Sequence, residues 1–334
     1  MAWTGWMLPS MSSIPMGDHI FIQIAAYRDP ELVPTLRDCL AKADHPELLT
    51  FGIAWQRDET ETLAEFARDD RIRLFECDWT ESRGACWARH RLQQFYGGEK
   101  FTLALDSHHR FVKGWDTALK KQLAGLLARR PVLTAYLPAF KPGAPLPRPG
   151  MTVLAADRFS EDGVLLFRPK VTTRWRRLFQ KPPRARFFSA HFTFSAGSFL
   201  ADCGHDPGLY FHGEEITLAV RAYTHGYDLF HPSRPVIYHE YTREGRPKHW
   251  DDHGPDSGRQ FGAPVFDHIS KTRVRQLLCM EPAMLDFGRY GLGSQRSLAD
   301  YERFAGVDFA NRRLSEEALQ GAAPRSVDAD EERC

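Results

Sequence analysis

Short apolar runs alternate with amphipathic or polar stretches along the first 136 residues of the chain. The apolar runs predict strands at 20–25, 48–55, 71–76, 101–105 and 132–136. Between the strands, the pattern predicts one helix that begins at Asp29-Pro30 and further helices at 59–70, 83–96 and 115–129. Strands that alternate with helices over short loops are typical of an α/β fold with a largely parallel sheet and helices on both faces.

The second half of the chain has a less regular pattern. Strands are predicted at 164–167, 191–195 and 236–239, and one strongly amphipathic helix at 214–225. Residues 141–150, with the sequence KPGAPLPRPG, predict a surface loop, because proline and glycine interrupt regular structure.

The composition describes a globular protein with no charge bias. The 334 residues carry 44 basic and 43 acidic side chains, a formal net charge of +1, which gives no general preference for nucleic acid. No apolar stretch approaches the roughly 20 residues that span a bilayer, and the first 17 residues do not resemble a signal peptide. Six dispersed cysteines without a CxxC pair fit a reducing compartment, so we expect a cytoplasmic location.

The most informative segment is FTLALDSHHRF at 101–111, where an apolar run ends abruptly in Asp106-Ser107-His108. Ligands of open α/β sheets gather at the carboxyl ends of the strands. Because residues two apart in an extended segment face the same side, Asp106 and His108 can both face one metal ion. A carboxylate with an imidazole suits Mn²⁺ better than Mg²⁺ and does not exclude zinc. The alternative is that Asp106 only caps the strand end.

Three further segments carry candidate chemistry. His239 follows an apolar run and is predicted at another strand end. Glu214 and Glu215 open a helix, where the helix dipole favours carboxylates even without a function. The turn at 81–85 leads into a helix, and its amides and basic residues could hold a pyrophosphate. Residues 168–186 hold eight basic and no acidic residues, which indicates either a solvated loop or a basic wall for an anionic ligand.

Four motifs in order resemble those of glycosyltransferase family 60. They are IAAYRDPEL (24–32), ESRGACWARH (81–90), LDSHHRF (105–111) and FHGEEITLAVRAYTHGYD (211–228). This family includes N-acetylglucosaminyltransferases that modify hydroxyproline or threonine on proteins, and it is distantly similar to the mucin-type polypeptide N-acetylgalactosaminyltransferases. The resemblance covers about residues 18–245.

The resemblance implies a Rossmann-like GT-A fold, a UDP-sugar donor (UDP-GlcNAc first), Mn²⁺ with Mg²⁺ as the alternative, and retention of anomeric configuration. It assigns the metal to Asp106, His108 and His239, and the donor sugar and acceptor to Glu214 and Glu215. The residues that it places against the nucleotide are Tyr27, Arg28, Asp29, Arg83, Gly84, Arg89, Asp106 and Ser107. It also places Arg110, Phe111, Trp115 and Asp116 on the acceptor side.

The chain is predicted to consist of one domain and two tails. We expect a tail at 1–17, a single GT-A domain at 18–310 and a polar, disordered tail at 311–334. Within the domain, residues 18–140 form the nucleotide-binding half and 151–310 the acceptor half. We expect neither the membrane anchor nor the lectin domain of the secretory relatives. The acceptor is therefore left open between a protein hydroxyl and a glycan hydroxyl, with no nucleic acid and no membrane span expected. The competing functions are a metal-dependent hydrolase and a sugar-nucleotide or glycan-binding module without activity.

Overall fold

A seven-stranded sheet forms the centre of the molecule. The computed structural model describes residues 17–147, 150, 152–171, 182–242, 246–254 and 262–324. The sheet has the order β10-β6-β9-β4-β1-β2-β3, and six of its strands are parallel. Its strands are β1 (Ile20–Tyr27), β2 (Leu49–Arg57), β3 (Ile72–Asp78), β4 (Phe101–Asp106), β6 (Pro131–Thr134), β9 (Phe192–Ala196) and β10 (Asp228–Phe230). The mostly parallel α/β sheet predicted from the sequence is confirmed.

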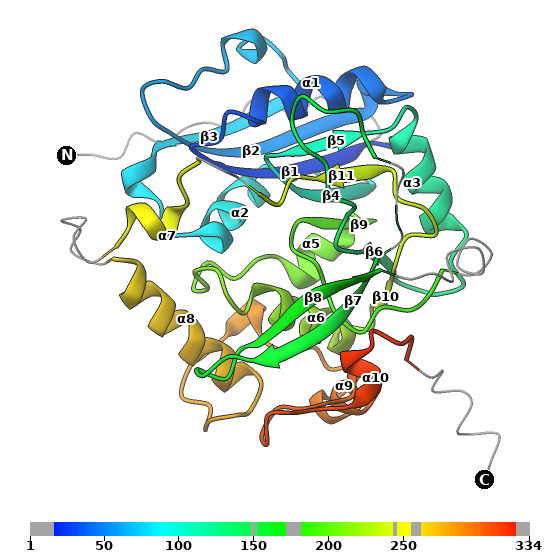
Figure 1. Ribbon diagram of the computed structural model, residues 1–334, viewed down its shortest axis with the longest axis vertical. Helices are drawn as coiled ribbons and strands as arrows, with labels where there is room; N and C mark the ends of the chain where they lie inside the picture. Colours follow the sequence, from blue (N-terminus) through cyan, green and yellow to red (C-terminus); the bar gives the residue numbers. More distant parts are fainter. Residues whose placement is uncertain are drawn as a thin grey trace.

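Helices cover both faces of this sheet (Figure 1). On one face, α1 (Leu32–Lys42) and α3 (Trp115–Ala124) contribute buried apolar side chains to one core cluster, which they share with β1, β2 and β4. On the other face lie α2 (Ala85–Gln93), α5 (Ser198–Cys203) and α6 (Glu214–Thr224). Burial on both faces explains why β1 and β2 are almost continuously apolar rather than alternating.

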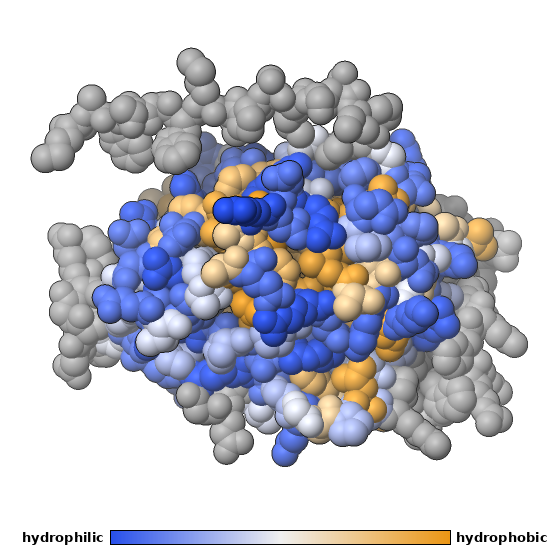
Figure 2. All heavy atoms as spheres, turned by 90° about the horizontal axis from the view of Figure 1, so that it is seen from above, coloured by the Kyte–Doolittle hydropathy of each residue, from blue (hydrophilic) through white to orange (hydrophobic). Residues whose placement is uncertain are grey.

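Smaller elements surround the sheet. β5 (His109–Phe111) pairs with β11 (Ile237–His239), β7 (Thr152–Phe159) with β8 (Leu165–Val171), and β12 (Val307–Asp308) with β13 (Arg313–Leu314). The remaining helices are α7 (His249–Asp252), α8 (Ala263–Leu277), α9 (Leu298–Ala305) and α10 (Glu316–Leu319), with short 3-10 turns at Pro46–Leu48, Ala64–Phe66, Trp79–Glu81 and Gly288–Tyr290. None of the described helices is long and apolar enough to cross a membrane. The face in Figure 2 is largely hydrophilic, with hydrophobic residues in separate groups.

One strand has a direction that the sequence did not predict, and one predicted helix is wrong. Strand β9 runs antiparallel to both neighbours. The helix predicted at 59–70 is wrong: the segment holds a single 3-10 turn at Ala64–Phe66. Its polar side chains bond the backbone instead, since Asp58 accepts from the Thr60 N–H at 2.9 Å and Thr62 from the Ala64 N–H at 3.2 Å.

The disordered tail expected at 311–334 is wrong for its described part, residues 311–324. Strand β13 and helix α10 both lie within 311–324, and Ala318 of α10 is fully buried. The expected tails at 1–16 and 325–334 lie outside the described residues.

Trp115 and Asp116, which the resemblance placed on the acceptor side, belong to the core. Both side chains are fully buried, and the Trp115 indole donates to the Cys39 carbonyl at 2.9 Å. The carboxylate of Asp116 accepts hydrogen bonds from the backbone N–H groups of Asp44 (2.8 Å) and His45 (3.0 Å). Asp116 therefore ties α3 to the loop after α1.

Replacing Asp116 by Asn should destabilise the fold without changing the site. The amide keeps only one oxygen, so one of two N–H donors loses its partner, at a cost of about 1–3 kcal/mol. Chemical denaturation of wild type and Asp116→Asn measures this loss. An unchanged unfolding free energy would contradict the structural role given to Asp116.

Candidate active site

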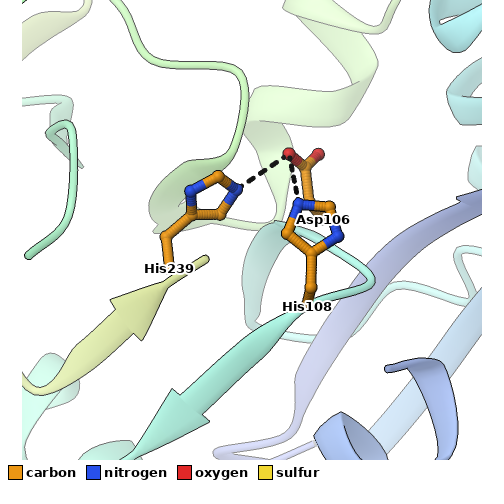
Figure 3. Close-up of side chains that lie close together, drawn as sticks. All are labelled: Asp106, His108 and His239. Atoms are coloured by element: carbon orange, nitrogen blue, oxygen red, sulfur yellow. Dashed lines mark hydrogen bonds and ion pairs between the residues drawn. The ribbon is translucent and has the colours of Figure 1, made fainter. Parts of the chain in front are cut away.

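An aspartate and two histidines meet at the carboxyl edge of the sheet. Asp106 ends β4, His108 follows in the turn to β5, and His239 ends β11. The pairing of β5 with β11 places His239 opposite His109. The side chains of Asp106, His108 and His239 point toward one another (Figure 3). One ligand atom from each lies within 4.8 Å of the others. The His239 Nε2 is 3.2 Å and the His108 Nε2 3.8 Å from Asp106 Oδ2. One carboxylate with two imidazoles fits Mn²⁺ and also fits zinc.

Asp29 supports this cluster from behind. It is 1% exposed, and its Oδ2 lies 2.7 Å from His108 Nδ1 and accepts from the Ser107 hydroxyl at 2.7 Å. Burial acts to raise the pKa of Asp29, but His108, Ser107 and Arg246 together hold it well below its usual range. The family resemblance placed Asp29 and Ser107 against the nucleotide. In the structure their side chains bond each other, and Asp29 bonds His108.

Arg89 is the buried cation beside the cluster. Its guanidinium donates to Asp106 Oδ1 at 2.6 Å and to the Ala190 carbonyl at 2.7 Å, and its Nε lies 3.2 Å from Glu214 Oε1. Burial would raise the pKa of Asp106, but the hydrogen bond from His239 and the charge of Arg89 hold that pKa well below its usual range. Asp106 is therefore ionised and able to act as a ligand at neutral pH.

Glu214 and Glu215 begin α6 and have different surroundings. The Oε1 of Glu214 lies 2.7 Å from His205 Nε2 as well as near Arg89. Glu215 accepts from the Tyr136 hydroxyl at 2.6 Å and from the Ala190 N–H at 3.0 Å. Burial, with the nearby charges of Glu214 and Asp106, raises the pKa of Glu215 to about 7 in spite of these two hydrogen bonds.

A cavity of about 610 Å³ opens over these groups. Of the residues expected from the sequence, it is lined by Tyr27, Gly84, Arg89, Asp106, Ser107, His108, Glu214, Glu215 and His239. Arg28 and Asp29 line a smaller neighbouring cavity instead. Arg83 is exposed and lines neither. The guanidinium of Arg28 bonds Asp58 and Asp252, and the Tyr27 hydroxyl donates to Asp252 at 2.8 Å.

Position 84, at the start of α2, requires a glycine because the backbone of Tyr210 lies too close for a side chain. Its φ is +99°, and a Cβ there would lie 2.4 Å from the Tyr210 carbonyl oxygen. The glycine therefore lets the amino end of α2 reach the cavity wall, where the helix dipole favours an anion.

Several lining residues were not found from the sequence. They include Tyr136, His191, Tyr241 and Trp250. His191 stacks on His239 with ring centroids 4.3 Å apart. It precedes β9, and because that strand is antiparallel, its beginning lies at the edge where the other strands end. Trp250 also lines the cavity, and the residue is 37% exposed. Its position in the aromatic and basic stretch 246–250 was the signal available.

The basic segment 168–186 is only partly described, since 172–181 lie outside the described residues. Within the described part, Arg186 is buried and donates to the carbonyls of Phe304 and Ala322, and Arg184 pairs with Asp228. These two residues do not form a basic wall.

Solved structures share this architecture. GalNAc-T7, solved with UDP, GalNAc and Mn²⁺, matches with a TM-score of 0.58 and 14% identity over 84% of this chain and 56% of that chain. S. aureus TarS 1-349 in complex with UDP-GlcNAc matches with a TM-score of 0.47 and 14% identity, over 85% of this chain and 70% of that chain. At these identities the likeness concerns the fold alone. The chain spans just over half the length of the GalNAc-T7 chain. Among curated proteins, sequence comparison gives no match.

The sheet, its cavity and the likeness to GalNAc-T7 define a GT-A fold, the fold of nucleotide-sugar glycosyltransferases. The model of the Glycosyltransferase (GlcNAc) family matches residues 19–68 and 60–311. The chain therefore belongs to this family. The family assigned from the four sequence motifs is confirmed.

The raised pKa of Glu215 predicts a pH-dependent stability. Its carboxyl has a pKa of about 7 in the fold against an ordinary value of 4.5, so between these pH values the folded chain keeps a proton that the unfolded chain loses. This contribution to stability is present below the lower value and is lost as the pH rises through about 7. Glu215→Gln removes the titration. We expect its melting temperature, relative to wild type, to rise as the pH increases across this range; a constant difference would contradict the shift.

Proposed function

We propose that this chain transfers a sugar, GlcNAc in the first instance, from a UDP-sugar to a hydroxyl group on a protein or glycan, with retention of configuration. The observation that carries the proposal is the cluster of Asp106, His108 and His239 inside the 610 Å³ cavity of a family member. The family's description supports GlcNAc as the donor sugar.

We assign a divalent metal, Mn²⁺ first and Mg²⁺ as the alternative, to Asp106, His108 and His239. When bound, such an ion supplies Lewis-acid stabilisation of the departing diphosphate. The amino end of α2 at Gly84 adds backbone dipoles at the same cavity. Arg89 has a different task from the direct phosphate contact expected from the sequence. It is bonded to Asp106, Glu214 and a carbonyl, so it keeps the ligand carboxylate charged and in place.

The partners of Glu214 and Glu215 favour attack by the acceptor on the same face of the sugar that the diphosphate leaves. A covalent route needs a carboxylate nucleophile at the anomeric carbon. Glu214 is 4% exposed and lies within ion-pair distance of Arg89 and His205, which lowers its nucleophilicity. Glu215 is held by Tyr136 and by the Ala190 amide. In the proposed step, the acceptor oxygen bonds the anomeric carbon, the bond to the diphosphate breaks, and the diphosphate takes the acceptor proton.

The cysteines support a cytoplasmic location for the enzyme. Cys39, Cys77, Cys86 and Cys203 are buried free thiols, and Cys279 is an exposed one. Free thiols are typical of reducing compartments.

The reaction can be tested without knowing the acceptor. Wild type incubated with single UDP-sugars and Mn²⁺ should slowly release UDP from one of them, most rapidly from UDP-GlcNAc, and EDTA should stop the release. Asp106→Ala should be at least about 100-fold slower, because Lewis-acid stabilisation is worth several kcal/mol. The control is Asp116→Asn, which alters a buried aspartate outside the cavity. Metal-independent release, or full activity of Asp106→Ala, would refute the proposal.

The chemical route gives a second test. With a slow donor, mass spectrometry of the intact wild-type chain should show no species heavier by one sugar residue, since no covalent sugar–enzyme bond forms. Glu214→Gln should lose activity because Arg89 loses a charged partner, and it should also show no adduct. A sugar adduct on Glu214 in the wild type would establish the covalent route instead.

A further inference from the structure

The carboxylate of Asp29 fixes the orientation of the His108 ring. Its Oδ2 is 2.7 Å from His108 Nδ1, on the opposite side of the ring from Asp106. An ionised carboxylate only accepts hydrogen bonds, so the hydrogen of a neutral His108 ring resides on Nδ1. The Nε2 lone pair is then left free toward Asp106 Oδ2, 3.8 Å away. Nε2 is the atom that a metal ion in this cluster would use.

Arg246 joins this support to the second histidine. Its Nη1 donates to Asp29 Oδ1 at 2.7 Å, and its Nη2 donates to Glu240 Oε2. Glu240 directly follows His239, and its N–H donates to the His108 carbonyl at 3.1 Å. The side chains of Asp29 and Glu240 are 0% and 4% exposed, and that of Arg246 is 11% exposed. One guanidinium therefore neutralises two buried carboxylates, one beside each histidine.

We infer that Asp29 and Arg246 are positioning residues for the metal site. Asp29 selects the His108 tautomer that presents Nε2, and Arg246 fixes Asp29 and Glu240 relative to each other and thereby His108 relative to His239. The inference rests on the proposed function, because it takes the Asp106 cluster as the metal site. It gives Asp29 a role different from the nucleotide contact that the family resemblance implied.

The expected size of the effect follows from the chemistry of such supports. A hydrogen-bonded partner that orients a metal-bound histidine changes metal affinity by about 10- to 100-fold when it is removed. Asp29→Asn has nearly the same shape, but its neutral amide can present either an acceptor or a donor to His108. Arg246→Lys keeps the charge but replaces a planar fork by a single ammonium group, which reaches one carboxylate well and not both.

The test measures Mn²⁺ binding directly rather than turnover. Free Mn²⁺ is titrated by electron paramagnetic resonance against wild type, Asp29→Asn, Arg246→Lys and the control Asp116→Asn, each with UDP present. We expect Asp29→Asn to bind about 10- to 100-fold more weakly, Arg246→Lys to lie between it and wild type, and Asp116→Asn to match wild type. Melting temperatures show whether each variant is folded. Asp116→Asn is the matched control because it also neutralises a fully buried aspartate that holds hydrogen bonds.

A second readout needs no metal. In protein labelled with ¹⁵N-histidine, NMR should show His108 as the Nδ1–H tautomer in wild type and as a mixture of tautomers in Asp29→Asn. A folded Asp29→Asn variant with unchanged Mn²⁺ affinity, or with the same His108 tautomer as wild type, overturns the inference. Wild type that binds no Mn²⁺ at all overturns the proposed metal-dependent function, and the tautomer comparison then decides the role of Asp29 separately.

Discussion

The position of the Arg89 guanidinium is the constraint on which the site depends. It is 4% exposed and bonds the end of β4 through Asp106, the start of α6 through Glu214, and the segment before β9 through the Ala190 carbonyl. A buried ion pair adds little net stability, yet removing one partner typically costs about 3–5 kcal/mol because a buried charge is left alone. Ala88 and Leu92 pack α2 against the sheet, and this packing places Arg89 between Asp106 and Glu214.

The two histidines of the cluster are supported in a similar way, but from the other side. Arg246 compensates Asp29 and Glu240, as Arg89 compensates Asp106 and Glu214. Unpaired carboxylates are costly to bury, and each guanidinium pairs with two of them: Arg89 with Asp106 and Glu214, and Arg246 with Asp29 and Glu240. This arrangement keeps carboxylates ionised next to the cavity without exposing them fully to water.

The sequence predicted the parts of this arrangement that depend on local pattern. The buried strands were predicted from apolar runs. Asp106 and His108 come directly after one of these runs, which placed them at the carboxyl edge of the sheet. What the sequence could not predict depends on the direction of strands and on distant partners. An isolated apolar run such as 192–196 does not reveal that it runs antiparallel, so His191 was missed. The motif residues Arg28, Asp29 and Arg83 were placed at the nucleotide by resemblance, but hydrogen bonds to residues far along the chain decide where Arg28 and Asp29 point.

The short sheet of β5 and β11 has a kinetic consequence. It pairs only three residues of each strand and is separate from the seven-stranded sheet. Together with a bridge between Ala139 and His239, it places His239 beside Asp106, 133 residues away in sequence. Small units with few backbone pairs open more easily than a central sheet, by sub-global fluctuations that leave the core intact. Amide hydrogens of β11 should thus exchange with solvent faster than those of β1 or β4, and an ion held by Asp106, His108 and His239 would slow that exchange by joining the two strands through their side chains.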